Sequence, residues 1–226
     1  MTSHCNHNDR KLRRHDLIFV SPAAWRSLMQ ARDDLSGEPW IVDWADQGWP
    51  LVARRAMPCE RDGVALGLPL PPFAGKRRIS LVMRPEDIVA KGPPLELRAA
   101  MSVAPEPWRR TLEEMASLAS RRGAEARIFG SLAWRALTGL DYLSAGSDLD
   151  FLLPLPHASD LASLTTELAA IEAAAPMRLD GELVRDDGAS VNWRELHTGE
   201  REVLVKTTDR VALLDAKHFV SGGILS

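Results

Sequence analysis

The sequence predicts an α/β (α+β) fold, in which a mixed sheet with flanking helices forms the C-terminal part and a smaller α/β domain precedes it. Three observations carry this prediction. Apolar runs of strand length alternate with helical repeats along residues 107–184, as layers of sheet and helix require. The 226 residues suffice for one large or two small domains. A stretch rich in proline and glycine, residues 91–107, indicates a boundary.

This boundary predicts an N-terminal domain over residues 15–92 and a C-terminal domain over residues 93–226. Residues 1–14 carry mostly polar and charged side chains, so we expect a disordered N-terminus. No apolar core of a signal peptide follows, and no apolar run approaches the roughly 20 residues of a membrane span. We therefore expect a cytoplasmic protein without a membrane anchor.

Local patterns in the N-terminal domain predict its elements. We expect strands over residues 16–20, 51–56, 64–68 and 79–83, and a further helix that starts at residues 84–87. Ser21 and Pro22 form a strong helix start, an N-cap followed by proline, for a helix that runs to about residue 33. Trp40, Trp44 and Trp49 could stack on an adenine, but we prefer the interpretation that they fill a small core.

The C-terminal domain is expected to alternate strands and helices. We predict helices over residues 107–122, 132–138 and 159–175, and strands over residues 126–129 and 148–153. A hairpin with strands over residues 177–184 and 189–195 should follow, and then a strand over residues 203–206. Asp209 is expected to cap a last helix that runs through Lys217.

Charge and cysteine content exclude some classes of partner. The formal net charge is −3, so no overall field draws the chain to nucleic acid or to an anionic membrane. Cys5 and Cys59 are the only cysteines, and their separation fits reduced thiols rather than a disulfide framework or a metal-ligand pair. Any phosphate site must therefore be locally basic.

The candidate site combines a glycine–serine pair with two aspartates. A short strand leads to Gly130-Ser131 at the start of a helix, and a loop then leads to Asp148-Leu149-Asp150 at the start of the next strand. Because residues i and i+2 of a strand share a face, both aspartates point the same way while Leu149 points into the core. Gly130 lets the backbone approach a phosphate, and a helix start at Ser131 favours an anion.

Two adjacent carboxylates repel each other unless a cation lies between them. Mg²⁺, with Mn²⁺ as an alternative, takes oxygen ligands and bridges to substrate phosphates. This combination predicts phosphoryl or nucleotidyl transfer, where catalysis is mostly positioning and charge neutralisation. A lone Gly-Ser or Asp-x-Asp usually marks only a turn or a cap, but the full order of strand, Gly-Ser, helix, loop and Asp-x-Asp favours function.

The stretch from residue 125 to residue 154 resembles the signature of the nucleotidyltransferase superfamily, although its gap between serine and the first aspartate is longer than usual. Residues 134–140 and 147–150 resemble one family in particular, the malonate decarboxylase holo-[acyl-carrier-protein] synthases, also called phosphoribosyl-dephospho-CoA transferases. The resemblance extends to residues 15–17, 75–79, 180–183 and 191–195, and it covers nearly the whole chain. It implies a nucleotidyltransferase-like catalytic domain over residues 93–226.

A third acid is expected from the superfamily, where it lies on a strand after the second helix. Asp180 matches it best, and it would ligate the metal or take the proton from the attacking hydroxyl. Glu182, on the same face of that strand, is the alternative. From the residues alone, Asp180-Gly181 could also be only a tight turn.

Positive side chains are needed to balance substrate phosphates. Lys76, Arg77 and Arg78 follow Gly75 without forming a Walker A motif, and they either hold phosphate or start a solvated strand. The substrate-binding candidates are Gly130, Ser131, Lys76, Arg135 and Lys206.

The resemblance implies a Mg²⁺-dependent transferase. It would move the 2′-(5″-phosphoribosyl)-3′-dephospho-CoA group from triphosphoribosyl-dephospho-CoA to a serine of the malonate decarboxylase acyl-carrier subunit and release pyrophosphate. Asp148, Asp150 and Asp180 would be its catalytic and metal-binding residues. Two alternatives stay open, transfer of AMP or another nucleotide to a different acceptor and a non-catalytic module that only binds a nucleotide or a partner. The acidic pair argues against the module, since binding alone needs no repelling carboxylates.

Overall fold

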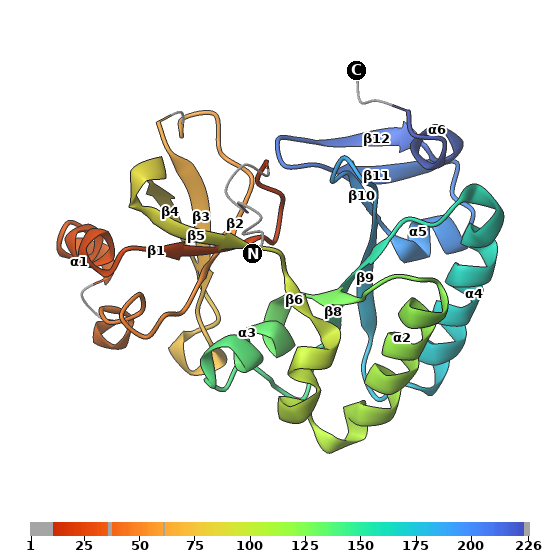
Figure 1. Cartoon of the computed structure of the whole chain (residues 1–226), viewed down its shortest axis with the longest axis horizontal. Coiled ribbons are helices and arrows are strands. Elements are labelled where there is room, and N and C mark those ends of the chain that lie inside the picture. Colours follow the sequence, from red (N-terminus) through yellow and green to blue (C-terminus); the bar gives the residue numbers. More distant parts are fainter. Residues whose placement is uncertain (1–10, 36–37, 61, 224–226) are drawn as a thin grey trace, which may run out of the picture. The chain divides into compact units, whose positions relative to one another are not determined.

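The chain folds into two compact units, Met1–Pro94 and Leu95–Ser226, shown in the computed structural model of Figure 1. The structure describes residues 11–35, 38–60 and 62–223. Most of the stretch predicted to be disordered, and Cys5, lie outside these residues. Both units combine a sheet with helices, so the predicted α+β fold class is confirmed. No helix in the described part of the chain is long and apolar enough to cross a membrane.

The N-terminal unit is built on an antiparallel sheet with the strand order β4-β3-β2-β1-β5. Its strands are β1 (Leu17–Val20), β2 (Leu51–Ala53), β3 (Val64–Pro69), β4 (Arg78–Met83) and β5 (Ile88–Gly92). Its helix is α1 (Pro22–Gln30), and its short 3-10 helices are η2 (Asp33–Leu35), η3 (Pro39–Ile41), η4 (Pro72–Ala74) and η5 (Pro85–Asp87). The four predicted strands are all present, although β2 ends three residues earlier than expected.

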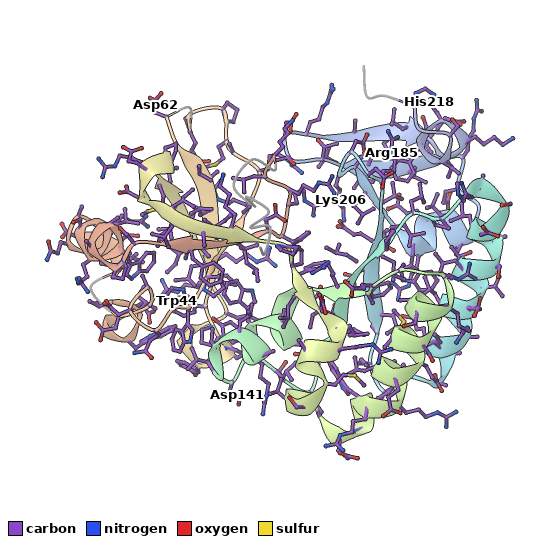
Figure 2. The ribbon with its side chains drawn as sticks, in the orientation of Figure 1. Trp44, Asp62, Asp141, Arg185, Lys206 and His218 are labelled. Atoms are coloured by element: carbon purple, nitrogen blue, oxygen red, sulfur yellow. The ribbon has the colours of Figure 1, made fainter. Side chains whose placement is uncertain are left out.

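Helix α1 begins as predicted, because the Ser21 hydroxyl accepts a hydrogen bond from the Ala24 N–H and Pro22 occupies the first turn. The three tryptophans pack against one another in a small core, which confirms the preferred interpretation. Trp44, labelled in Figure 2, is fully buried, and its ring centroid lies 4.8 Å from that of Trp49 and 6.2 Å from that of Trp40.

The prediction of a helix that starts at residues 84–87 is wrong. Only the single turn η5 forms there, and the chain continues as β5, which pairs with β1. Ile88 and Val89 are β-branched, and such side chains favour a strand over continuation of the turn.

The C-terminal unit is built on a mixed sheet with the strand order β12-β11-β10-β9-β8-β7-β6. Its strands are β6 (Leu95–Glu96), β7 (Arg127–Ile128), β8 (Leu149–Pro154), β9 (Leu179–Val184), β10 (Ser190–Asn192), β11 (Glu202–Lys206) and β12 (Val211–Asp215). Its helices are α2 (Arg109–Arg121), α3 (Gly130–Thr138), α4 (Ala158–Ala174), α5 (Trp193–His197) and α6 (Ala216–Val220), with 3-10 segments η6 (Leu97–Val103) and η7 (Glu106–Trp108). Strands β8 and β9 are parallel and the other neighbours are antiparallel.

One face of this sheet is covered by α2 and α4, which lie side by side in Figure 1. Leu149, Phe151 and Leu153 alternate along β8 and are buried in a core with the apolar side chains of both helices. The residues between them, which include Asp150, point to the opposite face, because successive strand residues alternate. The sheet therefore has an apolar face under the helices and a second face that carries the acids.

Two predicted elements near the C-terminus are wrong. Residues 193–195 are not strand but the start of α5, because the Asn192 side chain accepts a hydrogen bond from the Arg194 N–H and caps a helix there. Asp209 does not cap the last helix. Residues 211–215 form β12 against β11, and Asp215 caps α6 instead. Sequence patterns also missed β6 and η6.

Candidate active site

Three aspartates meet at the start of two parallel strands. Asp148 lies immediately before β8, Asp150 lies within it, and Asp180 lies within β9. The parallel register pairs Asp150 with Asp180 directly. Each of the three half-buried residues offers a carboxylate oxygen, and these oxygens all lie within 4.8 Å of one another.

This spacing fits one small divalent cation. An octahedral Mg²⁺ holds oxygens about 2.1 Å away, so ligands on opposite sides of the ion lie about 4.2 Å apart. The three acids therefore need only small side-chain movements to coordinate one ion together. Carboxylate oxygens are also the ligand type that Mg²⁺ and Mn²⁺ prefer.

Asp180 and Gly181 are not a tight turn, since both lie inside β9. Gly181 is required there for packing, because a Cβ atom at this position would lie 2.0 Å from the ring of Phe151. The absence of a side chain lets β8 and β9 stay in register, and that register holds the two acids opposite each other.

The glycine–serine pair lies against the acids. Helix α3 begins at Gly130, whose φ of +67° is a left-handed value that favours glycine. A Cβ atom on Gly130 would lie only 1.8 Å from Asp150 Oδ2. The Phe129 N–H donates to the Asp150 carbonyl at 3.2 Å, so the backbone before the helix is tied to the acid-bearing strand. The start of α3 and the acids form one site.

The long loop that brings Asp148 back from α3 is held by packing. Gly139 ends α3 with φ +73°, as predicted. Beyond it, the Tyr142 ring stacks on Trp134 of α3 at 5.9 Å between centroids. Burial raises the pKa of the Tyr142 hydroxyl above its ordinary value, so this anchor stays uncharged.

Glu182 is engaged elsewhere. Its buried carboxylate accepts hydrogen bonds from Ser190 Oγ at 2.6 Å and from Lys206 Nζ at 2.9 Å. Among the described residues, it is Asp180 and not Glu182 that groups with the other acids. Lys206, labelled in Figure 2, is therefore held on the acid-bearing face by an ion pair.

The other candidate cations have different partners or positions. Arg135 pairs with Asp141 at 2.9 Å. Lys76 lies in the N-terminal unit, exposed on the turn after Gly75, and the neighbouring Arg77 pairs with Glu38. Among the described residues, no contact joins Arg135 to the acids.

Asn192 is a site residue that sequence reasoning did not identify. Its amide nitrogen donates to Asp180 Oδ1 at 2.8 Å, while its amide oxygen caps α5. A signal was present, because Asn192 followed by Glu195 is the spacing of a helix start. The contact with Asp180 required the pairing of β9 with β10.

Sequence comparison relates the chain to one family of known proteins. Residues 96–217 match the model of the phosphoribosyl-dephospho-CoA transferase MdcG C-terminal domain, and residues 13–94 match that of its N-terminal domain. The phosphoribosyl-dephospho-CoA transferase of Bradyrhizobium diazoefficiens is 50% identical over 222 residues, which are 98% of each chain. The protein of the same name from Xanthomonas campestris is 39% identical, over 89% of this chain and 93% of its own. That from Pseudomonas putida is 32% identical, over 86% and 89%.

No solved structure matches the chain. Both halves of the sequence match the two domain models of one family, and the similarity to its curated members spans nearly the full length of both chains. The chain belongs to the phosphoribosyl-dephospho-CoA transferase family.

Proposed function

We propose that this chain transfers the 2′-(5″-phosphoribosyl)-3′-dephospho-CoA group from its triphosphate precursor to a serine of the malonate decarboxylase acyl-carrier subunit. The names of the relatives support the transferred group. The observation that carries the chemistry is the meeting of three carboxylates beside the start of α3. Such a site suits a polyphosphate substrate with a divalent cation.

The reaction is a displacement at the phosphorus atom next to the ribose. The serine oxygen forms a bond to this phosphorus, and the bond from phosphorus to the bridging oxygen of the pyrophosphate breaks. The serine proton passes to Asp180 or to solvent as the new bond forms. Pyrophosphate departs with the electron pair of the broken bond, so the donor itself supplies the driving force.

Asp148, Asp150 and Asp180 would hold Mg²⁺. When bound, the cation supplies positive charge to the triphosphate oxygens and to the leaving group. Asp180 would either accept the serine proton or complete the ligand set. Both roles need a carboxylate that keeps its position while substrate binds and product leaves.

Gly130 and Ser131 would bind phosphate through the backbone at the start of α3. The first N–H groups of a helix have no partner within the helix, and the helix dipole favours an anion there. Because Gly130 lies close to the Asp150 carboxylate, a phosphate bound there would lie beside the proposed metal ligands. Lys206 would add positive charge on the same sheet face, where Glu182 holds its ammonium group.

The test is to incubate the full chain with Mg²⁺, the purified carrier subunit and the triphosphate donor. Intact-mass measurement of the carrier should show the added group, and pyrophosphate should appear in equal amount. Asp148→Ala should abolish both signals. Asp160→Ala, which removes an exposed aspartate at the start of α4, is the matched control and should leave them unchanged.

The alternatives give different results in the same assay. Pyrophosphate release with ATP, and none with the triphosphoribosyl donor, would indicate nucleotide transfer to another acceptor. Donor binding with no pyrophosphate release from any donor would indicate a binding module. Full Mg²⁺-dependent turnover by Asp148→Ala would show that the metal site is assigned wrongly.

A further inference from the structure

Three consecutive residues at the start of α5 hold the segment of β9 that carries the third acid. Asn192 donates to the side chain of Asp180. The buried Trp193 ring nitrogen donates to the Leu179 carbonyl at 3.0 Å. Arg194 pairs with Glu172 of α4, which itself accepts from the Leu179 N–H at 2.8 Å. The backbone before Asp180 and its carboxylate are thus fixed from one short segment.

The Asn192 amide can make its two contacts in only one orientation. Its oxygen accepts from the Arg194 N–H at 3.0 Å, so the remaining end, which faces Asp180 Oδ1, is the donating NH₂ group. This contact limits the side-chain rotation of Asp180 and engages one of its two carboxylate oxygens.

We propose that Asn192 is a positioning residue that presets Asp180 for the divalent cation. This inference rests on the proposed function, because it takes the three acids as metal ligands. Residues that hydrogen-bond to metal ligands commonly change metal affinity or activity by about 10–100-fold when they are removed. Asn192 would therefore act on cation binding rather than on the bond-forming step.

The decisive variant is Asn192→Ser, because serine caps a helix about as well as asparagine but is too short to keep the contact with Asp180. Asn192→Ala loses both contacts. Asp215→Ala removes the cap of α6, a neighbouring five-residue helix, without touching the acids, and it is the matched control for capping. All three variants are studied as the full chain.

Mn²⁺ binding is measured without substrate, from the loss of the free-ion electron paramagnetic resonance signal. We expect Asn192→Ser and Asn192→Ala to raise the Mn²⁺ dissociation constant about tenfold or more, and Asp215→Ala to leave it unchanged. Thermal unfolding should group the variants by the loss of a helix cap and not by cation binding. Both alanine variants should have lower melting temperatures, and Asn192→Ser should have a value near that of the unaltered chain.

Turnover provides a second readout. In Asn192→Ser, the Mg²⁺ concentration for half-maximal rate should rise, while kcat at saturating Mg²⁺ should largely recover. If Asn192→Ser binds Mn²⁺ as tightly as the unaltered chain, the inference is overturned while the proposed function stands. If the unaltered chain binds no Mn²⁺ at all, the proposed metal site itself fails.

Discussion

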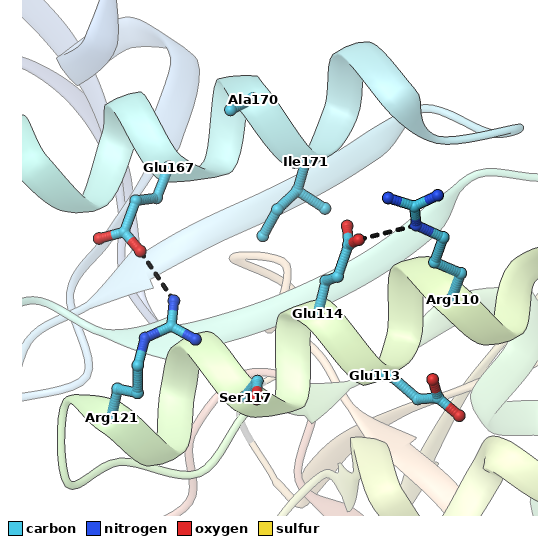
Figure 3. A pocket seen from close by; sticks show the side chains of 8 residues that line it. All are labelled: Arg110, Glu113, Glu114, Ser117, Arg121, Glu167, Ala170 and Ile171. Carbon is cyan, nitrogen blue, oxygen red and sulfur yellow. Dashed lines mark hydrogen bonds and ion pairs between the residues drawn. The ribbon is translucent and has the colours of Figure 1, made fainter.

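Charged side chains gather at two places in the C-terminal unit, the acid-bearing face of the sheet and the groove between helices α2 and α4, but in opposite arrangements. On one face, Asp148, Asp150 and Asp180 place like charges within 4.8 Å of one another. On the helical side, the groove between α2 and α4 in Figure 3 is lined by pairs of opposite charge, such as Arg110 with Glu114 at 2.9 Å.

The two arrangements have different costs. Pairs in the groove satisfy each other; the guanidinium groups of Arg122 and Arg121 lower the pKa of Glu167 below its ordinary value. Exposed pairs of this kind add little stability and need no ligand. Converging carboxylates oppose folding unless a cation joins them. Like-charge convergence is therefore the better indicator of function, although both regions are rich in titratable groups.

The largest expected effect follows from breaking the acid cluster. Asp148→Asn should lower turnover about a hundredfold or more, because a proposed metal ligand would be lost. In metal-free protein, the same change should raise the free energy of unfolding by about 1 kcal/mol, since two charges about 4 Å apart repel by roughly that amount in water. Steady-state kinetics and urea unfolding without metal measure the two effects.

A matched observation uses the metal itself. Mg²⁺ at about 100 times its dissociation constant should stabilise the unaltered chain by about 2.7 kcal/mol, and it should not stabilise Asp148→Asn. Equal stabilisation of both proteins by Mg²⁺ would contradict the proposal that the converging carboxylates bind the cation.

The next effect concerns the contact between the helix start and the acids. Gly130→Ala should destabilise the chain by about 1–3 kcal/mol more than Gly139→Ala, because its Cβ would overlap Asp150 Oδ2. Both glycines have positive φ, but nothing lies within 4 Å of a Cβ at Gly139. Gly139→Ala therefore reports the conformational cost alone, about 1 kcal/mol.

Turnover separates the two glycine variants further. Gly130→Ala should lose most activity because Asp150 must move, whereas Gly139→Ala should stay active. Denaturant unfolding and the carrier-labelling assay give both quantities. Equal stability losses for the two variants would mean that the Asp150 side chain moves away from the added methyl group at no energetic cost.

A smaller effect is expected from the ion pair on the acid-bearing face. Lys206→Met should cost about 2 kcal/mol of stability, since it leaves the buried Glu182 carboxylate without its cation. The partly exposed lysine keeps this below the loss typical of a fully buried pair. Combining Lys206→Met with Glu182→Gln should recover much of the lost stability, because no buried charge is then left unpaired. Urea unfolding of the single and the double variant measures this, and equal stability of the two would contradict the prediction.

The smallest effect is expected in the groove. Glu167→Gln should cost less than about 1 kcal/mol at pH 7 because its carboxylate is exposed to solvent. The lowered pKa means that the contribution is present above the unfolded value of about 4.3 and is lost as the pH falls through the lower folded value. Unfolding curves of both proteins should converge at low pH; a constant difference would assign the effect to packing.

Some of this molecule could be predicted from local patterns. Ser21-Pro22 started a helix, Gly139 ended one, and the apolar repeat of α2 lies in the core. These features depend on residues close in sequence, so neighbouring side chains decide them. The strand β12 could not be predicted in the same way. Its residues alternate in exposure only because they pair with β11.

The order of residues along the chain is enough to predict that Asp148 and Asp150 share a face beside a glycine–serine helix start, because a strand repeats every two residues. The distant groups that join these acids could be identified only from the folded chain. The parallel register brings Asp180 opposite Asp150, and strand pairing takes Glu182 to Lys206 and Asn192 to Asp180. This register depends on how core residues such as Phe151 pack against Gly181. That packing joins residues far apart in the chain, which no local period encodes.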